Sequence, residues 1–139
     1  MSDRRFRMRL GCRYAPPDNK LAELAVETFE DEAWKPFEPD LLSPGFQVFL
    51  SAAFSCQHLY FRTNCAERGL VLDSAEGELE VVTDRDWVIR RMQVRFVGRL
   101  ASGTPTQEAI DYIVERMGHC PVSANLKPIA EHQTRVELV

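Results

Sequence analysis

The cysteine at position 120 has the strongest local signs of chemistry in the sequence. Gly118 is expected to end one helix, and Pro121 suits the first position of a short helix over 121–126. Cys120 would then lie at or near the N-cap, where unpaired N–H groups and the helix dipole favour negative charge and lower the pKa of a thiol. His119 beside it adds positive charge when protonated. Cys120 is therefore a candidate redox cysteine, the alternative being an inert thiol that fills a gap.

The other cysteines carry weaker local signals. Cys56 lies in the middle of an apolar segment, where a sulfur gains nothing from a helix end and where burial raises its pKa unless an arginine comes close. By itself it is more typical of a core residue than of a catalyst. Cys65, nine residues further on, lies about 180° round a helix and cannot share the surroundings of Cys56. Cys12 falls on the apolar face of a predicted strand and is interpreted as a core residue.

The segment that must position Cys56 is a predicted helix from Ser43 to Gly69. Ser43 suits the N-cap, Pro44 the first turn, and Gly69 the C-terminal stop. Apolar side chains surround this helix on nearly every side, which predicts a buried central helix. One domain of this length can hardly cover all its sides, so we expect an obligate homodimer.

The rest of the chain predicts a sheet and a second helix. Residues 5–14 alternate between apolar residues and arginines, as in a half-buried strand. Residues 21–29 have helical spacing, although part of this segment also fits a strand, and 27–40 is expected to be an acidic loop. Further strands are expected at 70–82 with an interruption at 74–77, at 87–100 and at 134–139, and an amphipathic helix at 106–117. The predicted fold class is α+β, as one domain over 1–139.

Composition restricts the class of function. The 139 residues carry a net charge of −4, are 45% hydrophobic and contain no apolar run long enough for a membrane span. The arginines near the start form the wet face of a strand, so we expect no nucleic-acid partner and no membrane partner. Four cysteines without a secretory signal argue against a disulfide framework and favour a cytoplasmic protein.

Two motifs together resemble the OsmC and Ohr hydroperoxide-resistance proteins. The first, Ser43-Pro44-Gly45-Phe46-Gln47-Val48-Phe49-Leu50-Ser51-Ala52-Ala53-Phe54-Ser55-Cys56, looks like the family's apolar helix ending in a cysteine. The second, Cys120-Pro121-Val122-Ser123-Ala124-Asn125-Leu126, is similar to its Cys-Pro motif. The resemblance covers about residue 43 to the end. It implies an antiparallel sheet with a long buried central helix, in an intertwined homodimer whose two active sites lie at the subunit interface.

The resemblance also implies a function, that of a thiol-dependent peroxidase acting on small organic hydroperoxides without a cofactor. Cys56 would attack the O–O bond, Cys120 would resolve the resulting sulfenic acid as a disulfide, and a dithiol or lipoyl-type reductant would restore both. The family's peroxidases also use an N-terminal arginine and a glutamate near the start of the central helix. Here Arg13 is the best candidate for the arginine, while Phe46 and Gln47 occupy the glutamate region. Gln47 is the candidate site residue there, because it can form a hydrogen bond although it cannot form an ion pair with an arginine.

Three other functions are weighed from the sequence. A non-catalytic or redox-sensing protein of the same fold would bind a small apolar ligand at its dimer interface. A metal site would need Cys56, His58, His119 and Cys120, whose spacing matches no common zinc motif, so no metal is expected. A hydrolase is disfavoured because the sequence has no nucleophile-elbow pattern.

Overall fold

A six-stranded sheet forms one layer of the protein. The computed structural model describes residues 3–126 and 129–139, and its strands are β1 (Arg4–Ala15), β2 (Lys20–Glu30), β3 (Ala33–Pro36), β4 (Val71–Thr83), β5 (Ile89–Ser102) and β6 (Glu131–Leu138). Their order is β3-β2-β1-β4-β5-β6. Each neighbouring pair is antiparallel except β5 and β6, which are parallel. The expected antiparallel sheet is therefore corrected at one edge, because a helical crossover connects β5 to β6.

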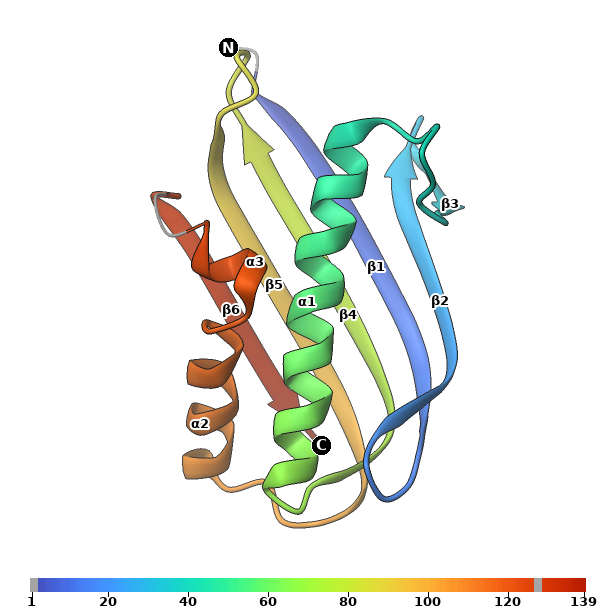
Figure 1. Cartoon of the computed structure of the whole chain (residues 1–139), viewed down its shortest axis with the longest axis vertical. Helices are drawn as coiled ribbons and strands as arrows, with labels where there is room; N and C mark the ends of the chain where they lie inside the picture. The colour runs from blue at the N-terminus through green and yellow to red at the C-terminus, as the bar shows by residue number, and fades with distance from the viewer. Residues whose placement is uncertain (1–2, 127–128) are drawn as a thin grey trace.

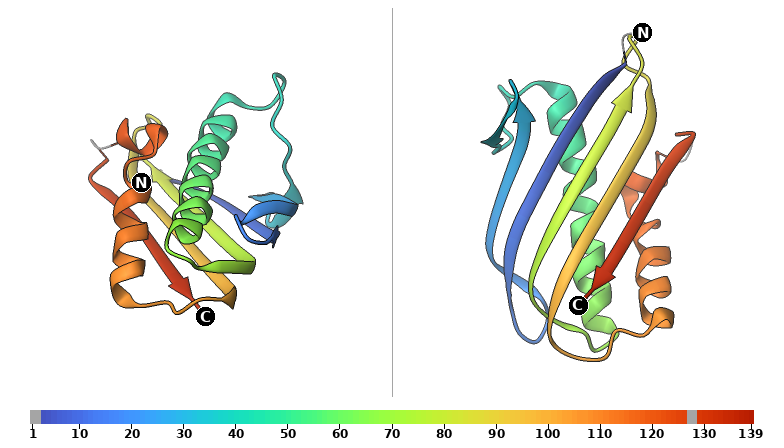
Figure 2. Two further views of the ribbon diagram at one scale, coloured as in Figure 1. Left: turned by 60° about the horizontal axis from the view of Figure 1, so that its bottom comes forward. Right: turned by 180° about the vertical axis from the view of Figure 1, so that it is seen from behind.

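Three helices lie on one face of this sheet and form the second layer (Figures 1 and 2). They are α1 (Gly45–Glu67), α2 (Gln107–Met117) and α3 (Pro121–Ala124). In Figure 1, α1 runs along the sheet, while α2 and α3 lie beside it on the side of β6. None of the described helices is long and apolar enough to cross a membrane. The mixed α+β class predicted from the sequence is confirmed, and the opposite face of the sheet carries no helix of the described chain.

The segment 20–30 is a strand, so its helical interpretation is wrong. β2 pairs with β1 along Met8–Ala15, and these backbone hydrogen bonds override a weak helical spacing. The expected acidic loop also contains the end of β2 and the short strand β3, where the Trp34 ring packs edge-on against Phe29 at 5.2 Å between ring centroids.

β4 is continuous, without the expected interruption at 74–77. Gly77 faces Phe96 of β5 in the register, and a Cβ at position 77 would lie only 2.6 Å from the Phe96 ring. Phe96 in turn stacks on Phe61 of α1, with 4.9 Å between ring centroids and 8° between planes. The glycine therefore allows an aromatic ring to lie between sheet and helix, rather than forming a turn.

The N-cap of α1 lies one residue later than the expected Ser43, and the helix stops where expected. Pro44 is the N-cap residue, and the Ser43 hydroxyl instead contacts Asp40 in the preceding turn. Gly69 follows the helix with φ +72°, the left-handed conformation that favours glycine. Burial is one-sided: Leu50 is 1% exposed, whereas Leu59 on the far side is 44% exposed. The expectation of burial on nearly every side is not met within the described chain.

Candidate functional site

Cys120 lies where the sequence predicted, at the N-cap of α3. Its sulfur accepts a hydrogen bond from the backbone N–H of Ser123 at 3.2 Å, and the Ser123 hydroxyl lies 3.1 Å away. Pro121 occupies the start of the helix, which ends at Ala124, short of the predicted Leu126. Cys120 is fully buried, so any charge on its sulfur depends on nearby donors rather than on water.

The side chain of Gln57 connects this N-cap to the rest of the fold. Gln57 lies on the buried face of α1, and its amide nitrogen donates to the Met117 carbonyl at 2.9 Å. The same nitrogen contacts the Ser123 hydroxyl and lies 3.5 Å from the sulfur of Cys120. Its amide oxygen accepts from the Thr134 hydroxyl of β6 at 3.2 Å. One amide thus ties four segments together around Cys120.

Cys56 directly precedes Gln57 on α1, and Cys56 and Cys120 each shift the pKa of the other. Burial, together with Cys120, raises the pKa of Cys56 to about 11. Burial alone would also raise the pKa of Cys120, but hydrogen bonds from Cys56, Ser123 and Gln57 outweigh it and lower that pKa below its ordinary value. All four cysteines of the chain are free thiols in this structure.

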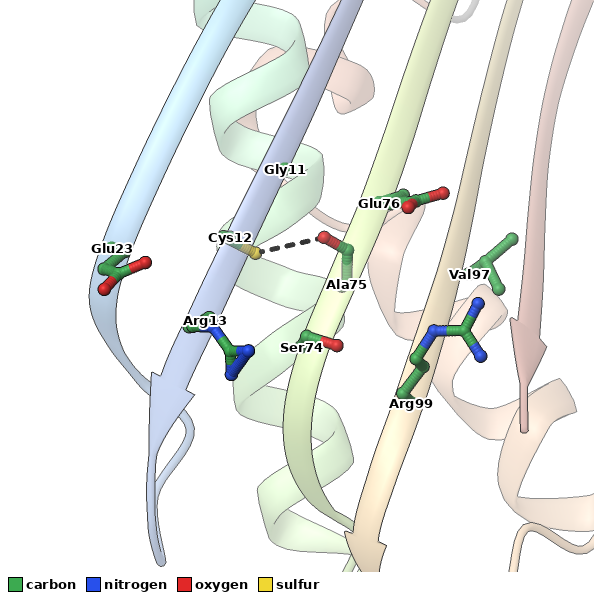
Figure 3. Close-up of a pocket in the computed structure, with 9 residues that line it drawn as sticks. All are labelled: Gly11, Cys12, Arg13, Glu23, Ser74, Ala75, Glu76, Val97 and Arg99. Atoms are coloured by element: carbon green, nitrogen blue, oxygen red, sulfur yellow. Dashed lines mark hydrogen bonds between the residues drawn. The ribbon is translucent and has the colours of Figure 1, made fainter.

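The other two predicted site residues do not reach the sulfurs within this chain. Arg13 lies on the outer face of the sheet, turned away from α1, beside Glu23, Ser74 and Arg99 around a pocket of about 230 Å³ (Figure 3). Its nearest acid is Asp73, at 4.0 Å between exposed side chains. Gln47 is half-buried in the first turn of α1, about 13 Å along the axis from Cys56 and half a turn round it.

The two histidines considered as metal ligands point away from the thiols. His58 contacts the Tyr14 hydroxyl at 2.6 Å and the Cys12 sulfur at 3.6 Å on the sheet side of α1. His119 pairs with Glu115 at 2.6 Å, with both side chains exposed. Within residues 3–126 and 129–139, no group of three or more His, Cys, Asp or Glu side chains is arranged to hold a metal ion.

Sequence reasoning missed Gln57, Ser123 and Thr134. Gln57 follows Cys56 directly, and the available signal was a polar amide at a position where the predicted helix is apolar. Ser123 occupies the third helical position after the Cys120 cap, where its N–H is one of the groups that needs an acceptor. Thr134 carried no usable signal, since only the sheet brings β6 next to α1.

One protein-family model matches most of the chain. The model of the OsmC family, described as OsmC-like protein, matches residues 39–135. No curated protein matches the chain.

Several solved structures have a similar fold at low sequence identity. An OsmC-like hydroperoxide resistance protein from Jannaschia sp. CCS1 is 16% identical, with TM-score 0.58 over 88% of this chain and 87% of that one. An OsmC-like protein from Mycoplasma pneumoniae is 10% identical, with TM-score 0.53 over 83% and 87%. A hypothetical protein from Aquifex aeolicus is 13% identical, with TM-score 0.58 over 83% and 87%. Identities this low support the fold alone. With the family match covering most of its length, the chain belongs to the OsmC family.

Proposed function

We propose that the protein is a thiol-dependent peroxidase that reduces organic hydroperoxides through Cys56 and Cys120. The observation that carries the proposal is that Gln57, the neighbour of Cys56 on α1, lies 3.5 Å from the Cys120 sulfur, so that two thiols from separate helices are brought close enough to shift each other's pKa. Membership of the OsmC family supports it. The name of the structural relative from Jannaschia, a hydroperoxide resistance protein, agrees with this choice of substrate class.

The chemistry needs both sulfurs. The Cys56 sulfur attacks the hydroperoxide, which breaks the O–O bond, forms a sulfenic acid on Cys56 and leaves an alkoxide that gains a proton to become the alcohol. The Cys120 sulfur then attacks the sulfenic sulfur, which forms the disulfide and releases water. The two thiols lose two electrons and the hydroperoxide gains them. A dithiol or lipoyl-type reductant returns the pair to thiols by exchange, in a reducing compartment such as the cytoplasm.

A second copy of the chain is proposed as the partner that completes the site. Cys56 is half-buried at the border of the exposed face of α1. That face carries apolar side chains open to solvent, with Phe49 37% and Leu59 44% exposed. Burial of such a stripe against its symmetry mate is a common basis of obligate homodimers. An intertwined homodimer of single-domain subunits would enclose Cys56 in an apolar cavity suited to the organic part of a hydroperoxide.

One observation favours the alternative of a redox-sensing or non-catalytic protein that binds a small apolar ligand. The pKa of Cys56 is raised to about 11 by burial and by Cys120, and no arginine or lysine is among the groups that shift it in the described chain. A thiol that ionises so weakly is a poor nucleophile. On the far side of α1, a pocket of about 190 Å³ lined mainly by leucines and Phe54 offers space for such a ligand.

Turnover distinguishes the two functions. The reduced protein is mixed with cumene hydroperoxide and excess dithiol, and consumption of the hydroperoxide is followed alongside the Cys56→Ser variant. Many turnovers per subunit that disappear in Cys56→Ser support the peroxidase. Oxidation of one equivalent per subunit without recycling supports the sensor. Hydroperoxide loss that is equal in the variant contradicts both roles for Cys56.

A further inference from the structure

The Cys120 sulfur is surrounded by groups that donate hydrogen bonds. The orientation of the Gln57 amide is unambiguous, because the Met117 carbonyl can only accept and must therefore face the nitrogen. This leaves the second N–H of Gln57 directed at the Cys120 sulfur and the Ser123 hydroxyl. The backbone N–H of Ser123 donates to the same sulfur at 3.2 Å. Two N–H groups thus point at Cys120, and neither can accept a proton from it.

The Ser123 hydroxyl adapts to the charge on the sulfur. It lies 3.1 Å from Cys120 and accepts a hydrogen bond when Cys120 is a thiol. A hydroxyl can rotate, so it donates instead when Cys120 is a thiolate. The Cys56 thiol, which also lowers the pKa of Cys120, adds a further donor. Charge-assisted hydrogen bonds of this kind are about twice as strong as neutral ones.

Within residues 3–126 and 129–139, no charged side chain is among the groups that shift the pKa of Cys56 or Cys120. His119, adjacent to Cys120 on the connection from α2, is turned outward to Glu115. On β6, His132 shares the inward-facing side of the strand with Thr134, and burial lowers its pKa so that it is neutral. On β1, Arg13 lies on the opposite face of the sheet. The groups of the described chain that lower the pKa of Cys120 are hydrogen bonds from α1 and α3.

We infer that Cys120 carries the negative charge of the reduced thiol pair and is the base that takes the proton of Cys56 as Cys56 attacks the hydroperoxide. In this chain Cys120 would thereby assist the ionisation of Cys56, a task that an arginine performs elsewhere by stabilising the neighbouring thiolate. Gln57 is a positioning residue that keeps donors on Cys120. The inference rests on the proposed function only for the identity of the oxidant, since the location of the charge is a property of the reduced protein.

In the first oxidation step one proton is transferred twice, and atoms and electrons balance. The Cys56 proton passes to the Cys120 sulfur as the Cys56 sulfur takes the terminal peroxide oxygen, and Cys120 then passes that proton to the leaving alkoxide. The products are the alcohol, the sulfenic acid of Cys56 and a regenerated Cys120 thiolate. This thiolate attacks the sulfenic sulfur, forms the disulfide and releases hydroxide, which solvent protonates. The lowered pKa of Cys120 makes its thiolate more available for both steps. Because the pKa of Cys56 is raised, the transfer of its proton to Cys120 is uphill and takes place only as the S–O bond forms.

The location of the charge is tested without any hydroperoxide. Thiolate absorbance at 240 nm is followed against pH in the reduced wild type, Cys56→Ser and Cys120→Ser. We expect a step below the ordinary thiol pKa that remains in Cys56→Ser, whose hydroxyl still donates, and disappears in Cys120→Ser. Cys12 and Cys65 do not interfere, because burial raises the pKa of both thiols. A step that disappears in Cys56→Ser and remains in Cys120→Ser overturns the inference.

The positioning role of Gln57 has its own variants. Gln57→Leu removes the side-chain donor and should move the absorbance step up by about one pH unit. Thr134→Val is nearly isosteric and removes the donor to the amide oxygen of Gln57. It should move the absorbance step in the same direction by a smaller amount. His119→Gln is the matched control and should leave the absorbance step unchanged. If Gln57→Leu does not fold, Thr134→Val decides, and an unmoved step in the folded variants contradicts the role of Gln57.

The role of Cys120 as a base is tested on the oxidation of Cys56 to the sulfenic acid, before any disulfide forms. Formation of the sulfenic acid at Cys56 is measured in a single turnover with cumene hydroperoxide, using a sulfenic-acid trap and peptide mass spectrometry. Cys120→Ser should slow this step about 100-fold at pH 7, with recovery at alkaline pH where Cys56 ionises by itself. An equal rate in wild type and Cys120→Ser means that Cys120 only resolves. No oxidation of either protein refutes the proposed function while the absorbance result still stands.

Discussion

Two buried polar clusters lie on either side of α1, and each contains a cysteine on the inner surface of the fold. The thiol cluster consists of Cys56, Gln57, Cys120, Ser123 and Thr134. The histidine cluster consists of Cys12, Tyr14 and His58. Cys120 and Cys12 are both buried, yet the pKa of Cys120 is lowered and the pKa of Cys12 is raised.

For both sulfurs burial raises the pKa and hydrogen bonds lower it, and the two cysteines differ in which effect is larger. Cys120 accepts from the Ser123 N–H and lies 3.5 Å from the Gln57 amide nitrogen, and such donors stabilise a thiolate. The Cys12 thiol donates to the Ala75 carbonyl at 3.7 Å (Figure 3). Burial raises the pKa of Cys12 more than its hydrogen bonds with Tyr14 and Ala75 and the charge of Arg62 lower it. The comparison indicates that a buried cysteine has a lowered pKa where hydrogen bonds outweigh burial.

The largest expected effect is on the selectivity of oxidation. With one equivalent of cumene hydroperoxide, Cys56 and Cys120 should form a disulfide while Cys12 and Cys65 stay reduced. Burial raises the pKa of Cys65 to about 12 and also raises that of Cys12, so both remaining cysteines should react more slowly than the pair at pH 7. Alkylation after denaturation, followed by peptide mass spectrometry, measures this. Oxidation of Cys12 at a comparable rate would remove the distinction between the clusters.

The second effect is a decrease in the free energy of unfolding at acid pH, caused by the histidine cluster. Burial, reinforced by the charge of Arg62, lowers the pKa of His58 from 6.5 to about 4. Between these two values the unfolded chain binds a proton that the folded protein does not, so stability falls as the pH drops. The loss should reach about 3 kcal/mol at pH 4.

Urea denaturation across this pH range, in wild type and in His58→Phe, isolates this contribution. His132 also has a pKa lowered by burial and acts in the same direction in both proteins. Only the difference between the two pH profiles therefore reports on His58. Parallel profiles would mean that His58 keeps its ordinary pKa in the folded protein.

A smaller effect is expected from removal of one hydroxyl in the histidine cluster. Tyr14→Phe deletes the group that contacts the His58 ring at 2.6 Å and keeps the ring packing. The free energy of unfolding should drop by about 1–2 kcal/mol. The 240 nm absorbance step assigned to Cys120 should not move, since the clusters lie on different sides of α1. A shift of that step would show that the two clusters are coupled.

The smallest effect is expected for the arginine first considered as the activator. Arg13→Ala removes an exposed side chain from the outer face of the sheet, 4.0 Å from Asp73. Stability should change by less than about 0.5 kcal/mol, and hydroperoxide turnover by less than about twofold. A loss of turnover in a folded Arg13→Ala variant would mean that Arg13 reaches a thiol in an assembly of two chains.

Local signals were reliable at some helix ends and not at others. Gly69 stops α1 and Cys120 is the N-cap of α3, as expected, whereas the N-cap of α1 is Pro44 rather than Ser43. The two confirmed ends depend on a few neighbouring residues, so they follow from the order of the residues. The segment 21–29 failed because its conformation depends on pairing with β1, a partner that its own spacing does not reveal.

The sequence by itself determined that the chain has a thiol suited to ionisation next to a proline, and a second one within a long apolar helix. Both are consequences of local order and periodicity. Only the tertiary structure decided that Gln57 and Thr134 lie beside Cys120, that Arg13 does not, and that His58 rather than Gln57 lies beside Cys12. Those outcomes depend on which elements pack against which sides of α1. Contacts of less than 4 Å between side chains of different elements form only once that packing is in place.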